Sequence, residues 1–142
     1  MMPIARLDLM GVIAVVLMAA GAQGQSFTTA AEVKPILTAT KPNWIAVRPY
    51  DGRDLLYFTN ALAWRCALTE IRYGVNGAPA ETVLPMEPCY EAEATPNALK
   101  MESILPYVAL PIGSVQSVSV EVTYDDGSKD LADYQRDAVL IE

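Results

Sequence analysis

The amino-acid sequence predicts an all-β protein, an antiparallel β-sandwich with a short helix at its N-terminal end. Apolar and polar residues alternate in several short segments with the two-residue period of a half-buried strand. Glycine, proline, aspartate or asparagine bounds these segments, and these residues favour turns. The segments recur at regular spacing, which favours an antiparallel sandwich over a parallel sheet.

Residues 1–24 have the pattern of a cleavable export signal. Arg6 supplies a positive charge, an apolar run extends from Leu9 to Ala22, and the run ends in small residues. This run is shorter than the roughly 20 apolar residues that a membrane-spanning helix needs, although an uncleaved anchor is the alternative. We expect cleavage after Ala22 or, slightly favoured, after Gly24. The mature chain would then have no membrane span and would work in the periplasm or outside the cell.

The remaining chain, residues 25–142, has the length of a single domain. It contains two cysteines, Cys66 and Cys89, and an even pair in an exported chain most often forms a disulfide. Closing a loop of about 24 residues stabilises a fold by roughly 3 kcal/mol on the chain-entropy model. A redox or catalytic role would need a Cys-x-x-Cys motif or a histidine partner, and the sequence has neither. The pair is therefore predicted to be a structural disulfide.

Net charge excludes two classes of partner. The chain carries a formal charge of −7 at pH 7. An acidic surface repels phosphate backbones and anionic lipid headgroups, so neither nucleic acid nor a membrane surface is an expected partner. Ordinary solubility requires a similar charge, and the charge therefore does not identify a partner.

A short helix is predicted at the start of the mature domain. Thr29 and Glu32 have the spacing of a capping box. Proline is tolerated in the first turn of a helix, so Pro35 predicts a helix over residues 35–40 that ends before Pro42.

The first predicted hairpin follows this helix. One strand runs over residues 44–48 from Trp44, the turn lies at Asp51-Gly52, and the return strand covers residues 55–59. These three features lie close together in sequence, so the loop between the strands is expected to be a few residues long.

The second predicted hairpin begins with Ile71, Tyr73 and Val75, which alternate with more polar residues. Asn76-Gly77 is a strong hairpin signal, and a return strand is expected over residues 82–84. The proline-containing stretch 91–99 is predicted to be a loop.

The last predicted hairpin has the clearest alternation. Its apolar residues are Val118, Val120, Val122 and Tyr124. The turn is expected at Asp126-Gly127, with a return strand through Leu131 and Tyr134.

Three segments together carry a family resemblance: residues 71–77, 107–115 and 118–127. They resemble immunoglobulin-like or fibronectin-III-like exported modules, over most of residues 44–135. The resemblance implies a sandwich with a strand entering a hairpin, a proline-marked strand and a final hairpin. The Cys…Trp…Cys spacing of true immunoglobulin domains is absent, because Trp64 lies beside the first cysteine, Cys66, and precedes it. The resemblance therefore transfers an architecture and no functional residue.

The chain contains no histidine, which excludes several catalytic and metal-binding arrangements. Ser-His-Asp and Cys-His catalysis and histidine-based metal sites all need an imidazole. Ser128 and Lys129 are adjacent in a predicted turn, and no Ser-x-x-Lys pairing stands out. A pair of carboxylates for acid-base catalysis could come from Asp51, Asp54, Glu91 and Glu93. The spacing of these four residues does not select any one pair. No catalytic residue, cofactor or metal is predicted.

Carboxylates also gather around the last turn, at Asp125, Asp126, Asp130 and Asp133. Carboxylate oxygens suit calcium, which needs six or more oxygen ligands. Asp-Gly is equally the residue pair that a hairpin turn favours for backbone reasons. Turn chemistry is the favoured interpretation.

A second cluster is rich in aromatic and arginine side chains, the types that dominate interaction hot spots. Buried aromatics and structural ion pairs are the alternative interpretation, since tryptophan is usually packed in the interior. The candidate interaction surface consists of Trp44, Arg48, Tyr50, Arg53, Asp54 and Arg65.

These observations favour a non-catalytic exported module that binds a protein or an envelope component, with an oligomeric state that the sequence leaves open. One alternative is a small periplasmic hydrolase that uses carboxylates or a Ser-Lys pair. Another is a structural subunit that adds an edge strand to an envelope assembly. A pocket with converging carboxylates, an exposed aromatic patch and an unprotected edge strand would distinguish the hydrolase, the binding module and the subunit, respectively.

Overall fold

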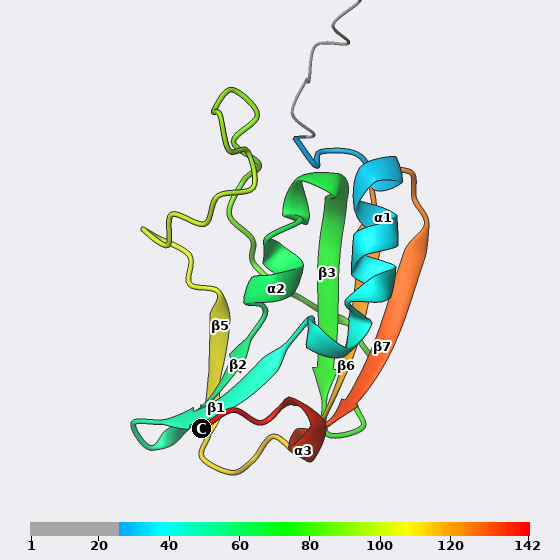
Figure 1. Cartoon of the computed structure of the whole chain (residues 1–142). Coiled ribbons are helices and arrows are strands. Elements are labelled where there is room, and N and C mark those ends of the chain that lie inside the picture. Colours follow the sequence, from blue (N-terminus) through cyan, green and yellow to red (C-terminus); the bar gives the residue numbers. More distant parts are fainter. Residues whose placement is uncertain (1–25) are drawn as a thin grey trace, which may run out of the picture.

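The computed structural model describes residues 26–142, and the predicted export signal lies outside these residues. The described chain is mostly strands, arranged in two antiparallel sheets with few helices (Figure 1). The prediction of a β-rich fold is therefore confirmed. None of the helices in residues 26–142 is long and apolar enough to span a membrane.

The smaller sheet has the strand order β1-β2-β5. Its strands are β1 (Ala46–Tyr50), β2 (Arg53–Tyr57) and β5 (Tyr107–Pro111). Asp51 and Gly52 form the two-residue loop between β1 and β2 and both have positive φ angles, 51° and 73°. Such angles define the turn whose twist matches a tight hairpin, so the predicted Asp51-Gly52 turn is confirmed.

The start of this hairpin differs from the prediction. Trp44 does not begin a strand: it caps a 3-10 turn, η1 (Lys41–Asn43), with helical φ and ψ angles of −63° and −35°. Proline at residue 42 favours this turn, because its ring restricts φ to a helix-compatible value. The strand therefore begins two residues later, at Ala46.

The larger sheet has the order β4-β3-β6-β7. Its strands are β3 (Leu68–Val75), β4 (Thr82–Val83), β6 (Ser117–Tyr124) and β7 (Lys129–Gln135). Every second residue of β6 is buried, as the alternation predicted. Gly127 has a φ angle of 82°, and its N–H bonds the carbonyl of Tyr124 to close the predicted β6–β7 turn.

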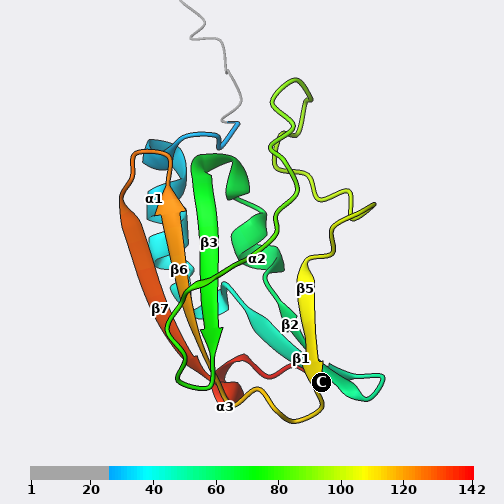
Figure 2. The ribbon, with the colours of Figure 1, turned by 180° about the vertical axis from the view of Figure 1, so that it is seen from behind.

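Helix α1 (Ala30–Ala39) lies across one face of the larger sheet, over β6 and β7 (Figures 1 and 2). One half of the capping box is present: Thr29 Oγ1 accepts a hydrogen bond from Glu32 N, whereas the Glu32 carboxylate accepts from Phe27 N and from the Thr29 hydroxyl. These caps start the helix five residues before the predicted residue 35, and Pro35 consequently lies in the second turn. The missing N–H of Pro35 is tolerated because Pro35 lies on the exposed side of the helix.

The core lies between α1 and the two sheets. Short helices α2 (Thr59–Leu62), η2 (Arg65–Ala67) and α3 (Arg136–Val139) close its ends. The largest fully buried apolar side chains are Trp44, Tyr124, Phe58, Leu37, Leu56, Ile71, Val33, Val47, Val115, Val120 and Val122.

A long segment without helix, residues 84–106, follows β4 and includes the predicted loop at 91–99. The Cys66–Cys89 disulfide ties this segment to η2. The prediction that the two cysteines pair is thus confirmed.

A candidate interaction surface and its polar supports

The six residues of the predicted interaction surface separate into two groups. Three have exposed or half-buried side chains on the β1–β2 hairpin: Arg48, Tyr50 and Arg53. The other three are buried and make internal contacts: Trp44, Asp54 and Arg65. For example, Trp44 has no exposed surface, and its indole N–H donates to the carbonyl of Leu37 at 2.9 Å. Only the first group can present side chains to a partner in this fold.

The strand register adds two tyrosines to the exposed group. Residues opposite one another in an antiparallel pair share a face of the sheet. Tyr50 lies opposite Arg53, and Tyr57 lies opposite Tyr107, so both pairs occupy the face that bears Arg48. The guanidinium of Arg48 stands 4.5 Å from the ring centroid of Tyr50. We call this outward side of β1-β2-β5 the aromatic-basic face.

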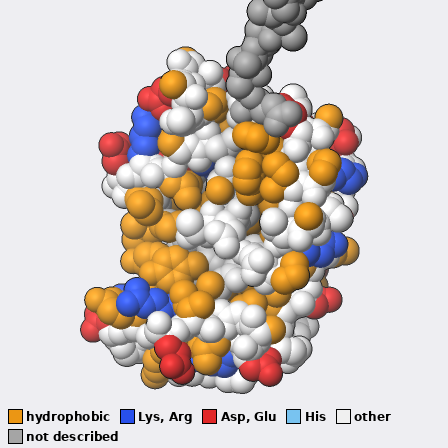
Figure 3. All heavy atoms as spheres, viewed as in Figure 1, with side chains coloured by type: hydrophobic (Ala, Val, Ile, Leu, Met, Phe, Trp, Pro, Cys, Tyr) orange, Lys and Arg blue, Asp and Glu red, His pale blue; other side chains and the backbone are white. Residues whose placement is uncertain are grey.

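Packing on the aromatic-basic face is close. The rings of Tyr57 and Tyr107 lie 5.1 Å apart, within the range of favourable aromatic pairs. Leu55 belongs to the same face and is only 3% exposed, although it is outside the main core. Its neighbours therefore cover it, and the face is a packed layer of side chains. On the surface shown in Figure 3, hydrophobic side chains gather over the region that this sheet occupies in Figure 1.

A hollow of about 480 Å³ adjoins the aromatic-basic face. Side chains from β1, β2, the start of α2 and the C-terminal tail line it, including Arg48, Tyr57, Asn60 and Ile141. Ile141 is held there because its N–H bonds the carbonyl of Val47 at 2.9 Å. The tail thereby closes one side of the hollow.

Charge on this face opposes the charge of the whole protein. Among its strand residues, Arg48 and Arg53 are the charged ones, and none of the strand residues on this face is acidic. The full chain carries −7. The aromatic-basic face is thus a locally cationic surface suited to an anionic partner.

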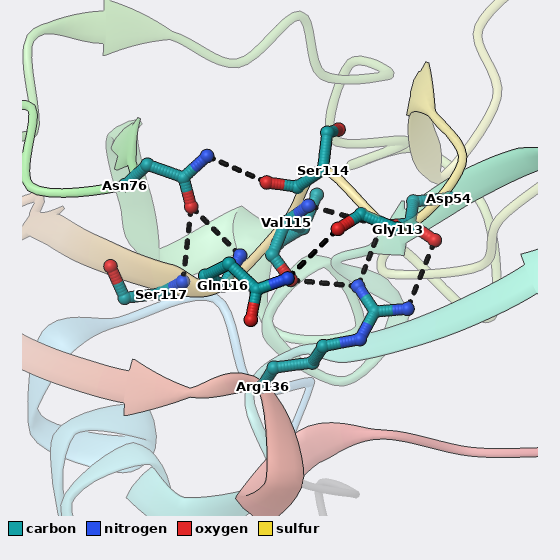
Figure 4. Close-up of polar contacts among 8 residues, drawn as sticks. All are labelled: Asp54, Asn76, Gly113, Ser114, Val115, Gln116, Ser117 and Arg136. Atoms are coloured by element: carbon teal, nitrogen blue, oxygen red, sulfur yellow. Dashed lines mark hydrogen bonds and ion pairs between the residues drawn. The ribbon is translucent and has the colours of Figure 1, made fainter.

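Asp54 lies between Arg53 and Leu55 in β2 but points to the other side of the sheet, where Arg136 of α3 meets it (Figure 4). The two guanidinium nitrogens donate to the two carboxylate oxygens at 2.6 and 3.1 Å. The N–H of Val115 donates to Asp54 Oδ2 at 3.0 Å, and Arg136 also donates to the Val115 carbonyl at 2.7 Å. The hydrogen bond from Arg136 is the main reason that the pKa of Asp54 falls from 3.8 to about 2.

Asn76 holds the same connection between β5 and β6 from the opposite side (Figure 4). Its amide nitrogen donates to the carbonyl of Ser114 at 2.7 Å, and its amide oxygen accepts from the N–H groups of Gln116 and Ser117 at 2.7 and 3.2 Å. Asn76 has a φ of 57°, which asparagine tolerates better than most residues. The residue predicted from its turn signal therefore also fixes the segment that joins the two sheets.

Arg65 holds the long segment after β4 against the core. It is 2% exposed and donates to five main-chain carbonyls, those of Leu62, Glu87, Pro88, Asn97 and Ala98, at 2.6 to 3.3 Å. Burial lowers the pKa of its guanidinium, while nearby Glu87 opposes this shift. Arg65 is thus a structural residue, as the alternative interpretation of its cluster proposed.

Glu87 is the acidic counterpart in this segment. Its carboxylate accepts hydrogen bonds from the Tyr90 hydroxyl and from the N–H groups of Lys100 and Met101 at 2.6 to 3.2 Å. Burial raises the pKa of Glu87, but these hydrogen bonds outweigh burial and leave the pKa below its ordinary value. These polar contacts supplement the apolar packing of Leu84, Met86 and Leu99 against the core.

A Ser-Lys contact that the sequence did not indicate joins Lys34 to Ser128. The ammonium of Lys34 donates to Ser128 Oγ at 3.0 Å across 94 residues of sequence. The hydroxyl of Ser128 in turn donates to Asp126 Oδ1 at 2.5 Å. Only tertiary packing of α1 on the β6–β7 turn brings the two residues together, so no local spacing could have revealed them.

Three of the four carboxylates named at this turn have protein partners. Asp126 binds Ser128, Asp130 accepts from the Tyr124 hydroxyl at 2.6 Å, and Asp133 accepts from Ser119 at 2.6 Å. Within residues 26–142, no group of three or more aspartate, glutamate, histidine or cysteine residues is placed to hold a metal ion.

The sequence could have revealed one of the two added tyrosines. Tyr57 stands two residues after Leu55 in the predicted return strand, and the two-residue period places both on the same face. Tyr107 was not predictable in this way, because its position depends on β5 pairing with β2 rather than with a sequence neighbour.

Comparison of the chain with known proteins adds no further assignment. No protein-family model, no curated protein and no solved structure matches it.

Proposed function

We propose that this protein is a non-catalytic exported module that binds an anionic protein or envelope component through its aromatic-basic face. The observation that carries the proposal is the concentration of Arg48, Arg53 and three tyrosines on one sheet face of a chain whose net charge is −7. Tyrosine and arginine combine large contact area with directed hydrogen bonds, and both are enriched at interaction hot spots.

The surroundings of the face support a binding role. The adjoining hollow of about 480 Å³ could receive a side chain from the partner. The face is also preorganised: Arg48 already stacks on Tyr50, and Tyr57 already packs on Tyr107. Little side-chain entropy would be lost on binding as a result.

Export is part of the same proposal. It rests on the signal pattern of residues 1–24, and the Cys66–Cys89 disulfide supports it, because disulfides persist mainly in oxidising compartments. The immunoglobulin-like sandwich stays a prediction as well. The two antiparallel sheets support it, and helix α1 adds a cover over part of the larger sheet.

The test is affinity capture by the tagged, oxidised mature chain (residues 25–142) from native envelope extract, followed by binding measurements on the retained component. Arg48→Ala combined with Arg53→Ala should reduce affinity at least tenfold and weaken its salt dependence, because two cationic contacts are lost. Tyr57→Ala should reduce affinity through lost contact area.

The matched control removes two cations elsewhere, by Arg72→Ala and Lys100→Ala. This pair causes the same change in net charge and should leave affinity within about twofold. Equal affinity of the wild type and the Arg48/Arg53 variant, with both folded, would contradict the proposal. Failure of the wild type to retain any component would contradict it too.

A second candidate function follows from the hydrogen bond between Lys34 and Ser128. Some hydrolases use lysine as the base that activates a nucleophilic serine. Here the Ser128 hydroxyl donates to Asp126 Oδ1 at 2.5 Å and accepts from the Lys34 ammonium, so the pair is not arranged as a nucleophile that gives its proton to lysine. Labelling of wild type but not of Ser128→Ala by a fluorophosphonate probe would support the hydrolase, and equal absence of labelling would favour the binding module.

A further inference from the structure

Strand β7 lies at the outer edge of the larger sheet in both views (Figures 1 and 2). Two hydrogen bonds establish which of its backbone groups face β6: Tyr124 N to Ser128 O, and Arg136 N to Gln116 O. The β6–β7 register continues this pattern, so the even-numbered residues of β7 hydrogen-bond to β6. The odd-numbered residues direct their N–H and C=O groups away from the sheet.

These outward groups have no backbone partner within residues 26–142. No backbone hydrogen bond outside the sheet ladders involves Leu131 or Asp133. Leu131 is also 60% exposed, the largest exposed fraction among the large hydrophobic residues of the described chain. A hollow of about 640 Å³ runs beside the strand, lined in part by Pro42, Tyr134 and Ala138. The edge therefore has room for a further strand.

The other sheet edges are less open. The C-terminal tail pairs with β1 at Val47, and Pro49 lacks the N–H that a neighbouring strand would need. Strand β4 has only two residues, and β5 ends in Pro111, whose carbonyl is bonded to Ser114 N. In contrast, β7 offers seven residues without a proline.

We propose that β7 pairs with β7 of a second copy of this chain, in an antiparallel arrangement centred on Leu131. The outward groups of both strands then hydrogen-bond, and the two larger sheets become one continuous sheet. Leu131 lies directly opposite Leu131 of the second copy, which buries the exposed side chain. Lys129 lies opposite Asp133 of the second copy, and the twofold symmetry produces this opposite-charge pair twice.

The charges select this register. Only pairing centred on Leu131 sets Lys129 directly opposite Asp133 of the other copy. Moving the centre by one residue places Leu131 opposite Asp133 or Lys129, and moving it by two places Asp133 opposite Asp133 or Lys129 opposite Lys129, so that like charges meet. Lys129 is 54% exposed while bonded to Glu121, and it can therefore contact a second carboxylate. The edge charges that usually oppose strand pairing are complementary in this one register.

The test measures the mass of the mature chain in solution by sedimentation equilibrium, for the wild type and for two charge reversals. Lys129→Asp sets two carboxylates opposite each other in its own dimer, and Asp133→Lys sets two ammonium groups opposite each other. Each variant alone should weaken dimerisation by about tenfold or more. An equimolar mixture of the two variants should recover the dimer. In the mixed dimer, the introduced aspartate at position 129 of one copy lies opposite the introduced lysine at position 133 of the other. The unchanged Asp133 of the first copy lies opposite the unchanged Lys129 of the second, so both pairs have opposite charges.

The matched control is Glu91→Lys, which changes net charge as Asp133→Lys does but lies in the exposed loop after the disulfide. It should leave the dimer unchanged, and melting curves confirm that each variant folds. A monomeric wild type at the highest soluble concentration overturns the proposal. So does a dimer that both reversals leave intact, or a mixture of folded variants that stays monomeric. The inference uses a different sheet from the aromatic-basic face and does not depend on the proposed binding function.

Discussion

Asp54 of β2 and Arg136 of α3 form a two-pronged ion pair across 82 residues of sequence, with Val115 bound between them. This contact joins the smaller sheet, the β5–β6 connection and the C-terminal helix. The helix leads into the tail whose Ile141 lines the hollow beside the aromatic-basic face. A buried polar contact on one side of β2 thus positions the proposed binding surface on the other side.

Asp54→Asn should destabilise the fold by about 3 kcal/mol, because it leaves the guanidinium of Arg136 without its carboxylate. Denaturant unfolding of wild type and variant measures this difference. Asp51→Asn, an exposed change in the same hairpin, is the matched control and should alter stability by less than about 0.5 kcal/mol. Equal loss in the two variants would show that the ion pair makes no special contribution.

The same carboxylate makes stability depend on pH. The pKa of Asp54 is about 2 in the folded chain, below its ordinary value of 3.8. The folded state therefore prefers the ionised form, and this contribution is fully present above about pH 4 and is lost as the pH falls from about 4 towards 2. The difference in unfolding free energy between wild type and Asp54→Asn should shrink over that interval. A constant difference from about pH 5 to pH 2 would contradict the assignment.

Arg65→Lys should loosen the segment after β4, although it keeps the positive charge. An ammonium has three donors, whereas Arg65 serves five carbonyls, so at least two would lose their bond. The expected cost is about 2 kcal/mol. Hydrogen exchange measures the effect locally: the amides of Lys100 and Met101 should exchange faster, while those of β6 should change little. Exchange rates of the Lys100 and Met101 amides that stay the same as in wild type would argue against this role.

Loss of the disulfide should act on the same segment. The double variant Cys66→Ala/Cys89→Ala removes the covalent closure between η2 and the segment after β4, with an expected cost of about 3 kcal/mol. Thermal unfolding with and without reductant checks this value. Reductant should lower the melting temperature of wild type and leave that of the double variant unchanged, and a drop in both would point to an effect other than the disulfide.

Gly74→Ala tests a close approach between two main-chain segments. A Cβ at this position would lie 2.2 Å from the carbonyl oxygen of Ala78 and 2.3 Å from that of Pro79. Both are backbone atoms, so the segment must move, and the expected cost is about 2 kcal/mol. Thr123→Ala on the same sheet face has no such clash and serves as the comparison. Similar urea midpoints for the two variants would show that the segment moves at little cost.

The hairpins were predictable because their information is local. The turn at Asp51-Gly52 needs positive φ at both residues, and aspartate and glycine supply it. Alternation in β6 follows from the two-sided geometry of any strand and is visible in a few consecutive residues. The start of α1 is the exception. The capping box indicates the true start, but Pro35 points to a later one, because the sequence does not show that the packing of Val33 and Leu37 outweighs an exposed proline in the second turn.

The candidate site was predictable only in part, because local sequence does not show which distant residues a side chain contacts. Residue type marked Arg48 and Tyr50 as candidate contact residues, and the structure leaves Tyr50 exposed and Arg48 half-buried. Residue type alone could not distinguish these contact candidates from the buried residues Asp54 and Arg65. Burial of a charged group depends on a partner that lies far away in sequence. Arg136 and the carbonyls that Arg65 binds come from segments that the hairpin prediction did not connect.

By itself, the sequence determined most of each hairpin strand, the tight turn at Asp51-Gly52, the cap of α1 and the pairing of two lone cysteines. Each follows from neighbouring dihedral preferences, side-chain alternation or simple chemistry. Tertiary structure alone decided that β5 pairs with β2, that Lys34 meets Ser128, and that β7 remains at an edge. These outcomes depend on how all the apolar faces are buried together, and no short stretch of sequence contains that information.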